Sequence, residues 1–273
     1  MIEGHDLDYV VSGVQTLHRV SIKAEAGEIV CVLGPNGAGK STLFRLLSGE
    51  LAPRAGKVTL LGQDVTTTPK DTLAKMRAVM PQESVLSFPF TAFEVVMLGR
   101  TPHASAGETM TDRAIARAAM AATDSLAYED RTFSSLSGGE RQRVTAARVL
   151  AQIWEGEEGR ALLLDEPTSS LDLLHQHGLL ETATTMAEKG CAVVCILHDL
   201  NLAARYATRV VVLQGGRKVA EGTPREVLTS ALLADVFEVD ARIFLPEGSE
   251  VPVVVPRGPL SKKKPPPATG ALL

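Results

Sequence analysis

The stretch EIVCVLGPNGAGKST, Glu28 to Thr42, decides the fold because it joins an apolar run directly to a glycine-rich loop and a helix. The apolar run is typical of a buried strand, and the residues from Lys40 onward are typical of a helix that ends before Gly49. Glycines let successive backbone N–H groups point inward, and the helix N-terminus adds the positive end of its dipole. The stretch therefore predicts a phosphate-binding loop from Gly34 to Thr42.

Each position of this loop is a candidate ligand of a nucleoside triphosphate. Lys40 would reach the β- and γ-phosphates, and the Ser41 hydroxyl would ligate Mg²⁺. The alternative is a glycine turn with an accidental lysine, but the strand and the helix that flank the loop favour the nucleotide site. The candidate nucleotide-binding residues of the loop are Gly34, Pro35, Asn36, Gly37, Ala38, Gly39, Lys40, Ser41 and Thr42.

A second apolar run, ALLLDEP, ends in two adjacent carboxylates, Asp165 and Glu166. Asp165 at the end of a strand would hold Mg²⁺ through its water shell, and Glu166 would polarise the attacking water. Adjacent acids after a strand are often only a solvated turn. The phosphate loop earlier in the chain makes a catalytic pair the better interpretation.

Further apolar runs, CAVVCILHD and RVVVLQGG, together with EIVCVLG and RALLLDE, predict strands buried on both faces of a parallel sheet. Helical segments between them indicate an α/β fold. Residues 1–57 alternate more loosely and predict a small antiparallel sheet, with VSGVQ as a turn. Residues of about 83–155 lose the strand signal, so we expect a helical insertion there.

The composition limits the class of protein. The chain has 273 residues, and its 45% hydrophobic content predicts a buried core. Its net charge of -4 does not indicate the basic face that binding of nucleic acid requires. The three cysteines lie in apolar runs and predict reduced core thiols. No apolar run approaches the roughly 20 residues that a membrane span needs.

The last residues change character. Residues 246–273 hold seven of the 15 prolines. Proline restricts regular helix and central strand, so we expect this stretch to be an extended or disordered tail. The three consecutive lysines within it are too few to predict a lipid-binding segment.

Four further motifs complete a recognisable order: VMPQES, LSGGERQ, SSLD and ILHDLN. With the phosphate loop and the paired carboxylates, they make the chain resemble the ATP-binding subunits of ABC transporters over about residues 1–240. The resemblance implies a P-loop NTPase of the ABC type, with an ATPase domain over residues 1–245, an antiparallel β-subdomain and a helical subdomain at about 83–155. It also implies ATP and Mg²⁺ as cofactors.

The resemblance assigns roles to residues outside the two strands. It implies that Gln82 contacts the metal and the reacting water, that His198 contacts the γ-phosphate as a switch, and that Asp172 belongs to the D-loop. Tyr9 is the candidate aromatic that stacks on adenine, although a tyrosine there can equally pack on the β-sheet.

The same resemblance implies a head-to-tail homodimer. In the family, the residues equivalent to Ser137, Gly138 and Gly139 of one chain cap the ATP that the other chain holds. Two shared sites follow from the two-fold symmetry.

Three stretches, AVMPQESVLSFPFTAFEVVMLGRTPH, VLAQIWE and LLLDEPTSSLDLLHQH, make the chain resemble bacterial haem (haemin) importer ATPases within the cobalamin and ferric-siderophore uptake group. This similarity implies a transmembrane permease that contacts Ser87 to His103, an indirect periplasmic binding protein, and a peripheral location at the cytoplasmic face of the bacterial inner membrane. Ferric siderophore and cobalamin remain alternative cargoes. A soluble ABC protein acting on DNA or ribosomes and a small-molecule kinase are more distant alternatives. His103, His175 and His177 show no metal-binding spacing and are interpreted as solvated.

Overall fold

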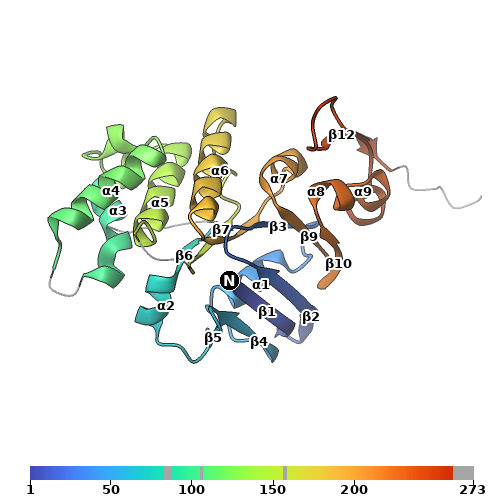
Figure 1. The fold of residues 1–273 in the computed structure, drawn as a ribbon, viewed down its shortest axis with the longest axis horizontal. Helices are drawn as coiled ribbons and strands as arrows, with labels where there is room; N and C mark the ends of the chain where they lie inside the picture. Colours follow the sequence, from blue (N-terminus) through green and yellow to red (C-terminus); the bar gives the residue numbers. More distant parts are fainter. Residues whose placement is uncertain (83–87, 105–106, 156–158, 261–273) are drawn as a thin grey trace, which may run out of the picture.

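The computed structural model describes residues 1–82, 88–104, 107–155 and 159–260. In these ranges the chain forms a parallel-containing sheet, an antiparallel sheet below it, a helical region to one side and a C-terminal hairpin on the other (Figure 1). The described strands are β1 (Ile2–Val11), β2 (Val14–Ala24), β3 (Ile29–Leu33), β4 (Ala55–Leu60), β5 (Gln63–Asp64), β6 (Arg77–Met80), β7 (Ala161–Asp165), β8 (Ala192–Ile196), β9 (Arg209–Gln214), β10 (Arg217–Gly222), β11 (Val239–Phe244) and β12 (Val253–Pro259).

The described helices lie between and around these strands. They are α1 (Lys40–Leu47), α2 (Lys70–Met76), α3 (Ala92–Met97), α4 (Met110–Ala122), α5 (Gly138–Gln152), α6 (Leu173–Glu188), α7 (Leu200–Tyr206), α8 (Pro224–Val227) and α9 (Ser230–Phe237), with 3₁₀ turns η1 (Leu98–His103), η2 (Leu126–Tyr128) and η3 (Phe133–Ser135).

The central sheet has the strand order β10-β9-β3-β8-β7-β6. Strands β6, β7, β8, β3 and β9 run parallel to their neighbours, and β10 pairs antiparallel with β9 at one edge. The antiparallel sheet has the order β2-β1-β4-β5. The prediction of an α/β fold with a parallel core and an N-terminal antiparallel sheet is confirmed.

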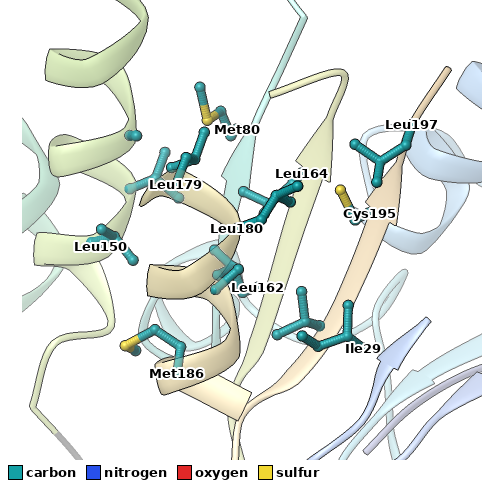
Figure 2. Packing of buried hydrophobic residues seen from close by; sticks show 14 of the residues in the cluster. Ile29, Met80, Leu150, Leu162, Leu164, Leu179, Leu180, Met186, Cys195 and Leu197 are labelled. Carbon is teal, nitrogen blue, oxygen red and sulfur yellow. The ribbon is translucent and has the colours of Figure 1, made fainter. Parts of the chain in front are cut away.

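The central strands are buried on both faces, as their apolar runs predict. Every residue of β3, β7 and β8 is buried. Alternate residues enter two hydrophobic clusters: Cys31 and Leu33 of β3 face the helices, whereas Val30 and Val32 face the antiparallel sheet and α1. Figure 2 shows the helix-facing cluster, in which residues of α6 such as Leu180 pack against β7. Both layers are thus anchored on the strands that carry the candidate site.

The helical region begins with strong N-terminal caps. Thr91 with Glu94, Thr109 with Asp112, and Ser137 with Glu140 form capping boxes at the starts of α3, α4 and α5. Each box satisfies two backbone N–H groups that a helix start leaves without partners. The predicted helical insertion is present in the described part of 83–155, where helices α3 to α5 pack on one another (Figure 1).

The C-terminal stretch corrects the prediction of a disordered tail over residues 246–273. Strand β12 pairs antiparallel with β11, and the side chain of Asn201 in α7 bonds both backbone groups of Val254. Proline is tolerated because both strands of a two-stranded sheet are edges, where a missing N–H can face away from the partner. The prediction is therefore wrong for residues 246–260, and residues 261–273, with the lysine triplet, lie outside the described residues.

Within the described ranges, no helix combines the length and apolar character that crossing a membrane requires.

Candidate nucleotide-binding and hydrolysis site

The candidate site lies at the edge where the parallel strands end. The phosphate loop follows β3, Gln82 follows β6, Glu166 follows β7 and His198 follows β8. These four strands are consecutive neighbours in the sheet, so their carboxyl ends meet at one edge. Residues more than 150 positions apart in the sequence are brought together by this topology, as ligand sites of open α/β sheets usually are.

The phosphate loop is closed by its own lysine. Lys40 is buried, with 6% of its surface exposed, and its Nζ donates to the carbonyl oxygens of Gly34 at 2.7 Å and Pro35 at 3.0 Å. Burial lowers the pKa of Lys40, and the carboxylates of Glu166 and Asp165 oppose that shift. The ammonium is thus held inside the loop and faces the carboxylates across the site.

Two glycines of the loop have no room for a side chain. Gly34 has φ 148°, and a Cβ there would lie 2.2 Å from the backbone oxygen of Leu213. Gly39, with φ 99°, caps α1, and a Cβ there would lie 2.7 Å from the oxygen of Thr16. The loop therefore passes directly against neighbouring backbone, which keeps its N–H groups at the start of α1 open to an anion.

Asp165 is the buried carboxylate of the site. Its surface is 7% exposed, and its Oδ1 has no hydrogen-bond partner among the described residues. Burial raises its pKa to about 6, and the neighbouring carboxylate of Glu166 adds to the rise. A buried carboxylate oxygen without a partner among the described residues, with the charges of Lys40 and Glu166 nearby, has the chemistry that a hard cation with a water shell requires.

Glu166 is held at its predicted position by Gln82 and His198. Gln82 Nε2 donates to Glu166 Oε2 at 2.9 Å, and His198 Nε2 lies 2.5 Å from Oε1. The backbone of Glu166 has φ 49°, a left-handed conformation that costs a residue other than glycine free energy. Glu166 is bonded at both carboxylate oxygens, whereas Asp165 Oδ1 has no partner among the described residues, so the two adjacent acids have different surroundings.

The second glycine loop lies in the helical region. Ser137 caps α5, where its Oγ accepts from Glu140 N at 3.3 Å, and Gly138 and Gly139 form the first turn. Ser137 and Gly138 are exposed. Helix α5 packs on α3, α4 and η1, whereas α1 packs on β1, β2 and β7. The two glycine loops therefore belong to different layers of the molecule (Figure 1).

Asp172 and Tyr9 lie outside this cluster. Asp172 caps α6 and accepts from His175 N at 3.0 Å. Tyr9 lies in β1 opposite Leu17, and its side chain packs against the cluster between the two sheets. That packing agrees with the structural alternative for Tyr9, and its contact with adenine stays a prediction.

The interpretation of three histidines as solvated is wrong. His103 Nε2 lies 2.8 Å from the Gln152 carbonyl, His177 Nδ1 lies 2.6 Å from the Tyr206 hydroxyl, and His175 bonds Asp172. All three are partly buried. Their partners lie 3 to 51 residues away in the sequence, and spacing alone gives no sign of such contacts.

One supporting residue was missed. Asp199 caps α7 through Oδ1, which accepts from Asn201 N at 2.7 Å and Leu202 N at 3.0 Å, and this fixes the chain directly after His198. An aspartate before an apolar helix is an N-cap signal that could have revealed it in the motif ILHDLN.

A phosphate loop, a carboxylate pair at the end of another strand of the same sheet, and a helical insertion with a second glycine loop define a P-loop nucleotide hydrolase of the ABC type. The family model described as ABC transporter matches residues 17–169, and the chain belongs to this family. It is an ATP-binding enzyme that hydrolyses ATP.

Two curated relatives cover most of the chain. The chain is 45% identical over 267 residues to the hemin import ATP-binding protein HmuV of Gloeobacter violaceus, covering 97% of each protein. It is 51% identical over 229 residues to the protein of the same name in Pseudomonas entomophila, covering 84% of this chain and 89% of the relative.

A solved structure agrees with the fold. The chain superposes on the dimeric structure of MJ0796, a bacterial ABC transporter cassette, with a TM-score of 0.72 and 26% identity, covering 82% of this chain and 99% of that one.

Proposed function

We propose that this chain is the ATP-hydrolysing subunit of a haem importer and couples ATP hydrolysis to haem movement through a separate membrane permease. The observation that carries the choice of cargo is the name of its relatives, hemin import ATP-binding protein HmuV, at 45% and 51% identity over most of the chain. The cargo does not contact this subunit in our proposal, so no residue here is assigned as a haem ligand.

The nucleotide is held by the loop from Gly34 to Thr42. Backbone N–H groups at the start of α1 and the Lys40 ammonium bind the phosphates, and Tyr9 stacks on adenine. Lys40 now bonds the carbonyl groups of its own loop, so binding exchanges those two hydrogen bonds for bonds to phosphate oxygens.

The residues that would hold Mg²⁺ are Ser41, Gln82 and Asp165. The fit rests on the Asp165 Oδ1 atom, which is buried without a partner among the described residues, and on the oxygen atoms of the other two side chains. When bound, the metal neutralises charge that develops on the phosphate oxygens. The buried Asp165 carboxylate would then gain the compensating charge that its raised pKa shows it lacks.

Glu166 acts as the general base that orients and polarises the attacking water. Gln82 and His198 bond its two carboxylate oxygens and fix its orientation, which is the condition for proton transfer at a defined position. His198 has half of its side chain exposed, at 49%, and can turn from Glu166 toward the γ-phosphate as the switch. Gln82 stands between the metal and the helical region and responds to both.

Two copies assemble head to tail, and each site is shared. Ser137, Gly138 and Gly139 of one copy would contact the γ-phosphate held by the loop of the other, with Asp172 nearby in the interface. Three features support this arrangement: the second loop is exposed, α5 and α1 pack on different elements, and the similar cassette MJ0796 is described as dimeric. ATP then stabilises the closed dimer, and loss of the γ-phosphate releases it.

The permease contacts the helical region beside Gln82. A groove of about 510 Å³ in the helical region is lined by Phe90, Phe93, Met97, Arg100, Arg117 and Glu129, among others. Within the predicted contact segment, Ala92, Val95 and Val96 are core residues, whereas Phe88 is 70% exposed. Ser87 lies outside the described residues. The exposed aromatic and the mixed apolar and charged groove fit a helix supplied by a membrane subunit.

In this proposal the chain is a peripheral subunit at the cytoplasmic face of the bacterial inner membrane. A periplasmic binding protein would deliver haem to the permease from the other side and would not touch this chain.

The test is a haem uptake assay in a strain that lacks the gene for this chain. The parent chain should restore uptake of labelled haem, and Glu166→Gln should not, although it should still co-purify with the permease. Uptake of a ferric siderophore or of cobalamin, measured in parallel, should not depend on this chain. Restoration of one of those cargoes in place of haem would replace the proposed cargo and keep the ATPase role.

A further inference from the structure

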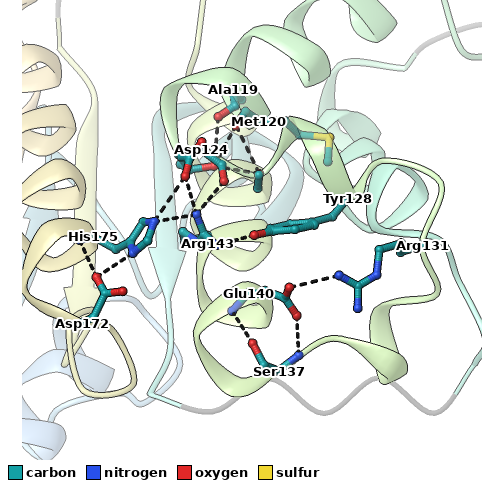
Figure 3. Close-up of polar contacts among 12 residues, drawn as sticks. Ala119, Met120, Asp124, Tyr128, Arg131, Ser137, Glu140, Arg143, Asp172 and His175 are labelled. Carbon is teal, nitrogen blue, oxygen red and sulfur yellow. Dashed lines mark hydrogen bonds and ion pairs between the residues drawn. The ribbon is translucent and has the colours of Figure 1, made fainter.

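A polar network joins the D-loop, Ser169 to Asp172, to the helix that carries the second glycine loop (Figure 3). Its members are Asp124 after α4, Tyr128 in η2, Arg143 in α5, and Asp172 and His175 at the start of α6. None of these residues lies at the sheet edge that holds Lys40 and Glu166. The hydrolysis site described above does not use the network.

Arg143 is the buried centre of the network. It is 9% exposed, its Nη2 lies 2.5 Å from the Tyr128 hydroxyl, and its Nη1 donates to the Asp124 carbonyl at 2.7 Å and Oδ2 at 2.6 Å. Asp124 has φ 49°, which turns both its carbonyl and its carboxylate toward the guanidinium. A buried guanidinium requires such partners, because leaving it unpaired carries a large desolvation cost.

His175 bonds Asp172 with one ring nitrogen and Arg143 with the other. Nδ1 lies 2.6 Å from Asp172 Oδ1, and Nε2 lies 2.8 Å from Arg143 Nη1. Nε2 also lies 3.2 Å from Asp124 Oδ2, the carboxylate that pairs with Arg143. The ring therefore spans the distance between the Arg143–Asp124 pair and the D-loop carboxylate.

Two further contacts join helix α5 to the segment that contains the D-loop. A Cβ on Gly139 would lie 3.0 Å from the Ser170 oxygen, and Gln142 Nε2 donates to the Pro167 carbonyl at 3.0 Å. Helix α5 thus contacts the segment around the D-loop at Gly139 in its first turn and again at Gln142 and, through His175, at Arg143. The network holds Asp172 by Oδ1 alone, and Oδ2 has no hydrogen-bond partner among the described residues.

We propose that His175 is a positioning residue, which fixes the Asp172 carboxylate to Arg143 so that the D-loop and the second glycine loop move together as one surface. The proposal rests on the shared site of the preceding section, because that surface is what one copy would present to the ATP of the other. Ordinary capping of α6 needs only the bond from His175 N to Asp172 Oδ1. The second bond, from the ring, adds the connection to α5.

The test compares three replacements that keep different parts of the connection. His175→Asn retains an amide near the Nδ1 position and can bond Asp172 only. His175→Gln reaches toward Arg143 and leaves Asp172, and His175→Ala removes both contacts. If His175 must contact both Asp172 and Arg143, all three replacements should lower kcat by about tenfold, because the loss of one hydrogen bond to a charged group corresponds to a rate factor of about that size. The affinity for ATP should change by less than about twofold.

A matched control is His177→Ala on the same helix, whose ring bonds Tyr206 and not the network. It should keep the parent kcat. Parent turnover in the Asn or Gln variant, or loss of ATP binding, would each overturn the proposal.

The same measurements separate this inference from the shared site itself. If Ser137→Arg is inactive while the His175 variants turn over normally, the shared site stands and the positioning role fails. If Ser137→Arg turns over normally, the shared site fails, and the positioning role fails with it. Thermal unfolding and nucleotide stoichiometry show that each variant is folded before its kcat is compared.

Discussion

The two glycine loops of this chain each stand at the start of a helix, but one is enclosed by its own chain and the other is exposed. The loop from Gly34 to Thr42 is enclosed by its own chain: Lys40 is buried, Gly34 is packed against backbone, and Asp165 is the buried carboxylate of the same site. The loop at Ser137 is exposed, and its capping bonds are all made within α5. A loop enclosed in its own site can hold phosphates by itself, whereas an exposed loop presents its donors outward.

This difference explains why one chain carries both glycine loops. The first loop lies beside the groups that hydrolysis needs, except for hydrogen-bond donors that cover the γ-phosphate. The second loop offers such donors, but it lies away from the nucleotide site of its own chain. Binding and turnover should therefore respond to different residues. The variants below test that separation, from the largest expected effect to the smallest.

Replacing Glu166 should have the largest effect, and it should act on turnover alone. Glu166→Gln keeps the shape and the bonding distance to His198 but removes the base, so we expect kcat to fall about 1,000-fold. ATP affinity should be unchanged, and the dimer should accumulate because it no longer hydrolyses its nucleotide. Phosphate release and analytical ultracentrifugation measure the two results. Turnover at the parent rate would remove Glu166 from its assigned role.

Replacing Ser137 should affect the second loop without disturbing the first. Ser137→Arg places a large side chain on the exposed surface, so it should not perturb the core but should block the contact with a second copy. We expect a fall in kcat of about 100-fold or more. The affinity for a fluorescent ATP analogue should stay within a few fold. Collapse of that affinity would mean that Ser137 belongs to the site of its own chain.

Replacing Lys40 should have the converse effect. Lys40→Ala removes the cation that the first loop offers to the phosphates, and charge-assisted bonds of this kind correspond to about 10- to 100-fold in affinity. Equilibrium titration with the same fluorescent analogue measures the loss. Lys40→Arg is the matched variant, and it should not restore affinity because the buried loop has no room for a guanidinium. Unchanged affinity in Lys40→Ala would contradict the assignment of this loop.

Replacing Asp165 should show by how much its buried carboxylate destabilises the folded state. Its pKa of about 6 in the folded state lies above the usual 3.8 of an aspartate, so the folded state binds the proton more tightly, and the cost of ionisation grows between about pH 4 and 6 and is complete above pH 6. Asp165→Asn should therefore raise the free energy of unfolding by about 2 kcal/mol at pH 8 without nucleotide or metal. The gain should shrink as the pH falls from 6 toward 4. A destabilised variant at pH 8 would show that the carboxylate is compensated in the fold.

The sequence predicted much of the site because its residues lie at strand ends. Lys40 follows a strand and a glycine loop, and Glu166 follows an apolar run, so local pattern and sheet topology together place both at one edge. The tertiary contacts of Glu166 could not be predicted in this way. Its bonds to Gln82 and His198 cross 84 and 32 residues, and local sequence pattern gives no sign of contacts over such separations.

The C-terminal hairpin and the histidines were mispredicted for a related reason. Proline content argued against strand β12, yet a two-stranded sheet tolerates proline at its edges, and Asn201 supplies partners for Val254 from another element. His175 appeared to be one of several isolated histidines, whereas the fold places it between Arg143 and Asp172. Local composition does not report contacts that form only when distant elements pack.

The central claim is that Ser137 of one copy lies over the first loop of another. A disulfide test addresses it directly: chains carrying Asn36→Cys are mixed with chains carrying Ser137→Cys, both in the Glu166→Gln background, with ATP and a mild oxidant. The three native cysteines are buried and free, and burial raises the pKa of Cys191 to about 12, so they should not compete. We predict a cross-linked pair of chains that forms only in the mixture and only with ATP. A disulfide within a single chain that carries both replacements, or a dimer without any cross-link, would contradict the shared site.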